Sequence, residues 1–180
     1  MPDEATGGGA PLPPELAAWI GRESEPLTLP DVVSDADLRR YANALDDANP
    51  LWQDDTYARA AGYAGRVAPP CLVLEFFRPP AGADENDERG LRSPGGVNAW
   101  GLEVPVPPEF TRMRRGEDDV EWFAPVRPGD RITARQRVAD IQLKAGRAGP
   151  LLLITRENEF VNHRGELLVR QRVTSIRRRE

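Results

Sequence analysis

The side chains best suited to chemistry lie in one short loop, Asp47-Ala48-Asn49-Pro50-Leu51-Trp52-Gln53-Asp54, which follows an amphipathic helical pattern. The loop has the form of an active-site loop, and general acid–base chemistry needs groups within hydrogen-bond reach of one water molecule. Asp47 and Asn49 also have a structural interpretation, since Asx residues routinely cap and order loops at helix ends. Trp52 cannot act as general acid or base, because indole is a hydrogen-bond donor only.

Few other side chains are candidates for catalysis or metal binding. Cys71, the only cysteine, lies in an apolar stretch and is expected to be a core residue rather than a nucleophile. His163, the only histidine, is expected in a surface turn. One cysteine and one histidine cannot form a zinc site of the usual composition, so no metal is predicted. Arg127, Arg131 and Arg135 either bind phosphate groups or form a solvated strand face.

Length and composition narrow the class of protein. The chain has 180 residues, which suits one domain with a full core, and a net charge of −5, which gives no large basic excess for binding nucleic acid. No apolar run approaches the roughly 20 residues of a membrane helix, and the acidic start shows no signal peptide. A single cysteine cannot form an internal disulfide, which fits a cytoplasmic protein.

Two helices are expected around the loop. Ser34 and Asp37 form a capping-box pattern, and apolar residues then repeat at helical spacing to about Asp46, since Pro50 disfavours helical geometry in the residue before it. A second short helix is predicted for residues 54–61. The loop is therefore expected to begin at the carboxyl end of one helix and to lead into another.

The longest apolar stretch, residues 67–78, is predicted to be a buried helix with Pro69 and Pro70 in its first turn, where missing N–H groups cost little. Polar, glycine-rich residues 81–96 are expected to form a surface loop. Strands are predicted at residues 26–33, 97–104, 118–126, 131–143 (with a bulge), 150–162 and 166–177, with a loop at 144–149. Helices followed by successive antiparallel strands predict an α+β fold.

Four segments, taken together in order and spacing, carry a family resemblance. They are Ile20-Gly21-Arg22-Glu23, Asp47-Ala48-Asn49-Pro50-Leu51-Trp52, Tyr63-Ala64-Gly65-Arg66-Val67-Ala68-Pro69-Pro70 and Glu121-Trp122-Phe123-Ala124-Pro125-Val126-Arg127-Pro128-Gly129-Asp130. The chain resembles the MaoC-like dehydratases and (R)-specific enoyl-CoA hydratases, in their N-terminal, degenerate form. The resemblance implies a single hotdog fold, a curved antiparallel sheet wrapped around a central apolar helix. The domain would span residues 15–180, with an extended loop region around 81–117, after a disordered segment 1–14.

The resemblance also implies a reaction, the reversible addition of water across the 2,3-double bond of an enoyl thioester. In catalytic members an Asp and a His on one loop activate the water, and a backbone N–H at the start of the central helix polarises the thioester carbonyl. Here Trp52 stands at the His position, and Pro70, which has no N–H, stands at the oxyanion position. Asp47 and Asn49 remain at their positions, but no residue is assigned a catalytic role.

Two losses at one site imply a non-catalytic, acyl-pocket-forming subunit of a heteromeric (R)-specific 2-enoyl-CoA hydratase or 3-hydroxyacyl thioester dehydratase. The implied partner is a second hotdog chain that carries the Asp/His motif, in a heterodimer or a dimer of heterodimers. The implied ligand is a CoA or carrier-protein thioester of a fatty acid or a bulky, steroid-type acid, and no cofactor is implied. The residues expected to contact substrate are Trp52, Tyr63, Pro70 and Leu72.

Two alternatives stay open at the level of the sequence. The chain could be a self-sufficient homodimeric hydratase that uses Asp47 with an unrecognised base, or an acyl-CoA-binding scaffold without hydratase activity. Trp122 and Phe123 suit either the core or an interface, and Trp52 suits either a roomy acyl pocket or a filled core. None of these functions involves nucleic acid or a membrane.

Overall fold

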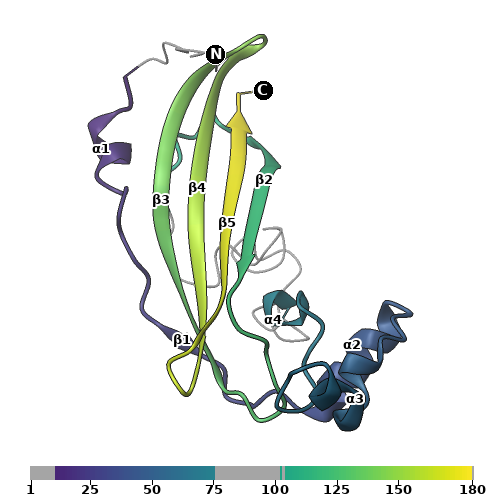
Figure 1. The fold of residues 1–180 in the computed structure, drawn as a ribbon. Coiled ribbons are helices and arrows are strands. Elements are labelled where there is room, and N and C mark those ends of the chain that lie inside the picture. The colour runs from purple at the N-terminus through teal and green to yellow at the C-terminus, as the bar shows by residue number, and fades with distance from the viewer. Residues whose placement is uncertain (1–10, 76–101, 103, 180) are drawn as a thin grey trace, which may run out of the picture.

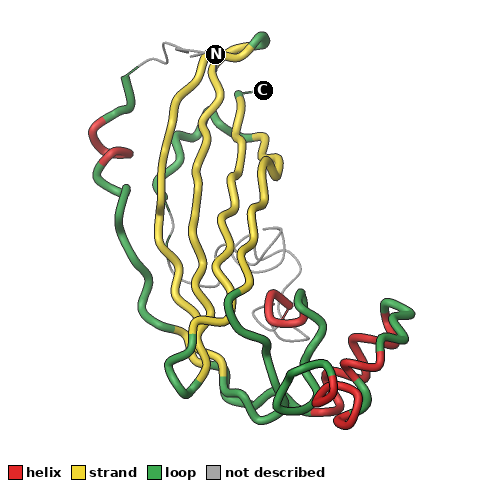
Figure 2. The backbone as a smooth tube through the Cα atoms, in the orientation of Figure 1, coloured by secondary structure: helices red, strands yellow, loops and turns green. Residues whose placement is uncertain are grey.

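One long, curved sheet dominates the molecule, and helices α2, α3 and α4 gather at one end of it (Figure 1, Figure 2). The computed structural model describes residues 11–75, 102 and 104–179. The sheet has five antiparallel strands in the order β1-β3-β4-β5-β2. The strands are β1 (Leu27–Thr28), β2 (Arg112–Trp122), β3 (Ile132–Gly146), β4 (Gly149–Asn162) and β5 (Leu167–Arg178). The helices are α1 (Pro14–Ala17), α2 (Asp35–Ala44), the 3-10 helix η1 (Pro50–Trp52), α3 (Asp55–Ala60) and α4 (Leu72–Glu75).

Helix α2 begins and ends as its sequence predicts. The Ser34 hydroxyl accepts a hydrogen bond from the N–H of Asp37 at 3.2 Å, and the Asp37 carboxylate accepts from the N–H of Ser34 at 2.8 Å, which confirms the capping box. At the other end Asp46 has a φ of 52°, and the N–H of Asp47 donates to the carbonyl of Ala42 at 2.9 Å. This left-handed closure is a Schellman motif, and it turns the chain sharply out of the helix.

One face of β3, β4 and β5 is buried, with alternate side chains pointing inward. At the helical end of the sheet, Phe160 belongs to an apolar cluster that includes Val73 of α4. Towards the other end, Ile154 belongs to a second cluster that includes Leu16 of α1. Full burial of such side chains stabilises the fold by about 1.5–3 kcal/mol each. The sheet is therefore stabilised by one apolar cluster at each of its ends.

A row of buried carboxamides crosses the same face of the sheet. Gln136 on β3 donates to Asn158 on β4 at 2.9 Å, and Asn158 donates to Gln171 on β5 at 3.1 Å. Gln171 then donates to the carboxylate of Asp118 on β2 at 3.1 Å. Buried amides are costly unless they are hydrogen-bonded, so a shift of any one strand would break the row. The row therefore fixes the register of four strands.

Several strand predictions agree with the structure. The bulge predicted in β3 lies between Val138 and Asp140, and the hairpin of β4 and β5 is confirmed. The strand predicted at 118–126 corresponds to β2, which begins earlier, at Arg112. The strand predicted at 26–33 is reduced to the two residues of β1.

Two other predictions are wrong. The expected loop at 144–149 is mostly strand, because β3 and β4 continue into a tight turn that ends at Gly149, whose φ of 114° suits glycine. The strand expected at 97–104 is not found at its two described residues, Leu102 and Val104. Both are buried and pack in the cluster with α1, so burial rather than strand geometry explains their apolar character.

The buried helix predicted over residues 67–78 begins later than expected. Helix α4 starts at Leu72, and Pro69 and Pro70 precede it instead of forming its first turn. A residue before proline is pushed towards extended geometry, so Pro70 keeps Pro69 out of a helix. Cys71 is exposed, and the expectation that it is a core residue is therefore wrong.

Parts of three predictions fall outside the described residues. They are most of the disordered segment 1–14, the surface loop 81–96 and the end of the helix predicted over 67–78. Within the region 81–117 that was expected to be an extended loop, residues 112–117 belong to β2.

Candidate functional site

The loop that begins at Asp47 is closed by its own hydrogen bonds. The Asp47 carboxylate accepts from the backbone N–H of Asn49 at 3.1 Å through Oδ1, and from the indole N–H of Trp52 at 2.9 Å through Oδ2. Asn49 Oδ1 accepts from the N–H of Leu51 at 3.1 Å and so caps η1. Asx side chains order turns in this way. Both oxygens of Asp47 therefore have partners within the loop.

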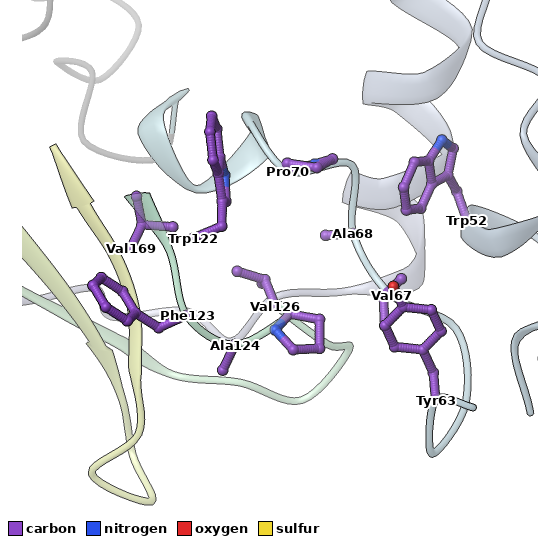
Figure 3. Close-up of a pocket in the computed structure, with 11 residues that line it drawn as sticks. Trp52, Tyr63, Val67, Ala68, Pro70, Trp122, Phe123, Ala124, Val126 and Val169 are labelled. Carbon is purple, nitrogen blue, oxygen red and sulfur yellow. The ribbon is translucent and has the colours of Figure 1, made fainter. Parts of the chain in front are cut away.

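Trp52 joins this loop to an apolar cavity. Its side chain is buried, its ring borders the cavity, and the nitrogen edge of the ring faces away from it (Figure 3). The indole nitrogen can donate a hydrogen bond but cannot take up a proton near pH 7. Trp52 therefore holds the Asp47 carboxylate as a fixed acceptor and cannot exchange protons with a substrate.

Pro70 also lines the cavity (Figure 3). The N–H of Ala68 donates to the carbonyl of Val126 at 2.8 Å, and the N–H of Leu72 donates to the carbonyl of Pro69 at 3.0 Å. Pro69 and Pro70 carry no N–H at all. The chain therefore presents no backbone donor at position 70 that could polarise a carbonyl group.

The cavity between the loop and the end of β2 has a volume of about 240 Å³. It is lined by Trp52, Tyr63, Val67, Ala68, Pro70, Trp122, Phe123, Ala124, Pro125, Val126 and Val169 (Figure 3). Among the described residues of this lining, only Tyr63 has an ionisable side chain. The volume is below the roughly 300–1,000 Å³ of typical ligand pockets. The cavity therefore suits one part of an apolar ligand and offers no acid–base pair.

The cavity is open along its β2 side. Trp122 and Phe123 follow one another at the end of β2, and each is 51% exposed although it lines the cavity. Large aromatic side chains left half in water are typical of surfaces that another molecule covers. The sequence left these two residues open between core and interface, and their exposure excludes the core.

The segment from Tyr63 to Val67, whose two end residues line the cavity, is hydrogen-bonded to the start of α3. Asp55 Oδ1 accepts from the backbone N–H of Arg66 at 2.8 Å and from its Nε at 3.3 Å. Gly65 passes so close that a Cβ atom there would lie 3.2 Å from Asp55 Oδ1. The backbone hydrogen bond from Arg66, together with the positive charge of its side chain, holds the pKa of Asp55 below its ordinary value.

Three of the four residues expected to contact substrate lie together around the cavity: Trp52, Tyr63 and Pro70. Leu72 does not line it, and packs instead in the apolar core. Val169, on β5, lines the cavity without having been predicted. Its place depends on the order of the strands, which no local pattern in the sequence reveals.

Two of the three arginines considered as phosphate ligands, Arg131 and Arg135, have partners within the chain, whereas the Nε of Arg127 is buried without a hydrogen-bond partner among the described residues. Arg131 donates to the carbonyls of Leu29, at 3.2 Å, and Pro30. Arg135 forms an ion pair with Glu23 at 3.3 Å. These contacts favour the interpretation of a solvated strand face.

His163 lies exposed in the turn between β4 and β5, as the sequence predicts. Among the described residues no cluster of His, Cys, Asp and Glu side chains could hold a metal ion. Within the same part of the chain, no helix has the length and apolar character to cross a membrane.

Comparison with known proteins places the chain in a family. It matches the FAS1-like dehydratase domain region over residues 18–171. It is 30% identical to a UPF0336 protein of Streptomyces avermitilis over 150 residues, which cover 83% of this chain and 81% of that protein. It is 28% identical to the probable enoyl-CoA hydratase alpha subunit of Thermomonospora curvata over 167 residues, which cover 90% of this chain and 50% of that protein.

The fold is similar to that of a chain in the crystal structure of the ChsH1-ChsH2 complex from Mycobacterium tuberculosis. The TM-score is 0.74, the identity is 19%, and the match covers 92% of this chain and 94% of that chain. At this identity the likeness shows the fold alone, and it confirms the hotdog fold expected from the sequence. The chain therefore belongs to the family of the FAS1-like dehydratase domain region, with the fold of the MaoC-like dehydratases.

Proposed function

We propose that this chain is the non-catalytic, acyl-pocket-forming subunit of a heteromeric (R)-specific 2-enoyl-CoA hydratase or 3-hydroxyacyl thioester dehydratase. One observation carries the proposal: both oxygens of Asp47 are held inside the loop, one of them by the indole N–H of Trp52. A carboxylate oxygen can accept more than one hydrogen bond, but the implied hydration also needs an imidazole beside the carboxylate to pass the proton. Trp52, which takes that place, can only donate a hydrogen bond.

The cavity supports an acyl-binding role without chemistry. Its lining is apolar and aromatic, which suits the hydrocarbon part of a thioester, and Tyr63 is the only titratable group that the described residues contribute to it. With proline at position 70, the thioester carbonyl finds no oxyanion donor there. A single such donor contributes about 10²–10³ in rate to acyl chemistry, so hydration requires a site on another chain.

Relatives and structural neighbours support a partner chain. A relative of similar sequence is named as the alpha subunit of a probable enoyl-CoA hydratase, and the structural neighbour comes from a complex of two differently named components. The half-exposed pair of Trp122 and Phe123 opens the cavity towards such a partner. The partner is a hotdog chain that carries the Asp/His motif, and the ligand is a CoA or carrier-protein thioester of a fatty or steroid-type acid.

Hydratase assays of the purified chain, of the partner and of the reconstituted pair test the proposal. The chain alone is expected to give no turnover with short or long 2-enoyl-CoA substrates, and the pair is expected to exceed the partner alone. Turnover by the chain alone that is abolished by Asp47→Asn would instead establish a self-sufficient enzyme. A pair no more active than the partner would leave a binding or scaffold role.

Ligand binding gives a second readout that does not depend on turnover. Trp52 borders the cavity, so an acyl-CoA is expected to change its fluorescence, whereas CoA alone is not. The matched control is Trp19→Phe, which removes a tryptophan packed with α1, away from the cavity. If Trp52→Phe leaves the acyl-dependent change intact and Trp19→Phe removes it, the cavity is not the acyl site.

A further inference from the structure

Arg156 is a buried arginine near the middle of β4. It is 4% exposed, and its Nε is buried without a hydrogen-bond partner among the described residues. It lies on the inner face of the sheet, the face that carries both apolar clusters, because it alternates along β4 with the buried side chains of Ile154 and Asn158. Long cationic side chains usually bury the stem and keep the charged head in water, which a side chain this deeply buried cannot do. The charge of Arg156 therefore lies in the interior without a described partner.

A second arginine, Arg177 on β5, lies on the same face. It pairs with Leu152 in the register of β4 and β5, and opposite residues of an antiparallel pair point to the same face. Leu152 is buried and lies two residues before Ile154. The Nε of Arg177 is likewise buried with no hydrogen-bond partner in the described part of the chain, and burial lowers the pKa of its side chain. Two cations thus share the inner face of β4 and β5.

No described carboxylate balances this pair of charges. Burial, and then the positive charge of Arg177, lowers the pKa of Arg156 to about 10, and no described acidic group acts in the opposite direction. Asp118, which lies on the same face of β2, already accepts hydrogen bonds from Gln171, at 3.1 Å, and from Arg115. A buried charge without a counter-charge is strongly destabilising. The inner face therefore carries positive charge that a bound anion would neutralise.

We propose that Arg156 and Arg177 bind the carboxylate of an apolar carboxylic acid on the inner face of the sheet. A guanidinium group and a carboxylate form two parallel hydrogen bonds, and one carboxylate has enough lone pairs to accept from two guanidinium groups. Such an anion supplies an acceptor for the two Nε atoms that lack a described one. This proposal goes beyond the hydratase proposal and does not rest on it, because binding of a free acid needs neither a partner chain nor the cavity beside Trp52.

The surroundings of the two arginines favour a carboxylate with a hydrocarbon chain over a phosphate. Arg156 lies opposite Val138 on β3 and Val173 on β5, and both valines are buried. Ser175, the next residue after Val173 on this face, donates its hydroxyl to the carbonyl of Ile154 at 3.3 Å. A phosphate group has three strong acceptor oxygens, and these side chains offer it no further donor. A carboxylate needs only the two arginines, and its chain can lie against the apolar side chains.

A ligand has access to the two arginines from the β2 side of this face. Arg177 is partly exposed, and so is Met113, which lies opposite it on β2. Arg115 and Asp118, on the same face of β2, have 36% and 33% of their side chains exposed. A carboxylate can therefore reach Arg177 from solvent and continue to the more deeply buried Arg156.

Thermal unfolding and titration calorimetry with octanoate test the site. Octanoate is expected to bind and to raise the Tm of the unaltered chain, whereas octanol, which lacks the charge, and inorganic phosphate are not. Arg156→Met is expected to weaken octanoate binding about 100-fold, because it removes the buried partner of the carboxylate. The matched control, Arg178→Met, removes the exposed arginine next to Arg177 and is expected to leave binding unchanged. Octanoate that does not bind, or phosphate that stabilises the chain equally, would overturn the proposal.

Stability without ligand gives a second readout. Arg156→Met removes a buried charge that has no described partner, so the ligand-free variant is expected to have a Tm higher by about 2–4 °C or more. Breaking an ion pair within the fold has the reverse effect, so a lower Tm in this variant would contradict the proposal. Arg177→Gln changes a partly exposed residue, where folding is less sensitive, and is expected to weaken octanoate binding about 10-fold.

Two CoA thioesters distinguish the source of the carboxylate. Octanedioyl-CoA has a free carboxylate at the far end of its acyl group, whereas octanoyl-CoA has none. If the source is an acyl thioester, Arg156→Met weakens binding of octanedioyl-CoA and leaves binding of octanoyl-CoA unchanged. If the source is a free acid, Arg156→Met weakens binding of octanoate alone. Octanoate binding that Arg156→Met does not change would overturn the arginine site, while octanoyl-CoA binding tests the acyl pocket of the hydratase proposal separately.

Discussion

The Asp47 loop and strand β2 both carry several polar groups, and these groups are partnered in different ways. In the loop, both carboxylate oxygens of Asp47 accept hydrogen bonds from residues no more than five positions away. On β2, most charged side chains face solvent along an edge that pairs with the sheet on one side only. One region is closed by its own hydrogen bonds, and the other lies open to solvent.

The closed loop agrees with the proposed function, in which this loop carries no base. A free carboxylate in a half-buried loop is costly unless it is hydrogen-bonded, and the indole N–H of Trp52 provides that bond while filling space. The two side chains thereby stabilise the loop. In the proposed function, the chain acts through its open surfaces, the cavity mouth and the edge beside it.

The largest expected effect comes from Trp52→Ala. It removes a large buried side chain and leaves one oxygen of Asp47 without its donor, so the free energy of unfolding should fall by about 3–5 kcal/mol. Denaturant unfolding followed by circular dichroism measures this. Trp122→Ala removes the same side chain at the half-exposed end of β2 and should cost about 1 kcal/mol or less in the monomer. Equal losses of unfolding free energy in the two variants would show that Trp52 is no more firmly packed in the fold than Trp122.

Asp47→Asn is expected to have a smaller effect. The amide keeps one acceptor, so either the Asn49 N–H or the Trp52 indole loses its partner, at a cost of about 1–2 kcal/mol. Asp119→Asn on β2 is the matched control and should change the monomer's stability by about 0.5 kcal/mol or less. Activity of the reconstituted pair should stay within about twofold, whereas losing a true general acid or base costs about 10²–10⁴-fold.

Local signals account for what the sequence predicted well. The capping box at Ser34 and the end of α2 near Asp46 depend on residues within one turn, and both are found. The bulge in β3 and the final hairpin likewise follow from alternation and turn residues. Trp52 was recognised as unable to act as a base because that property belongs to the side chain alone.

Contacts between distant segments account for what the sequence did not predict. The early start of β2 was missed because an edge strand covered with charges shows no apolar alternation. Val169 faces the cavity only because β5 lies beside β2 in the sheet. The bond from Trp52 to Asp47 also went unpredicted, since it requires the shape of the whole loop.

The smallest effect is expected from Asp55→Asn, and it depends on pH. The backbone N–H and charge of Arg66 lower the pKa of Asp55 in the folded chain, so its stabilisation is complete above the unfolded pKa of about 3.9. That stabilisation is lost as pH falls through the lower, folded-state pKa. The variant should therefore have a lower Tm than the unaltered chain at pH 7, and the difference should vanish in strong acid. A difference that persisted there would mean that the carboxylate charge is not the cause.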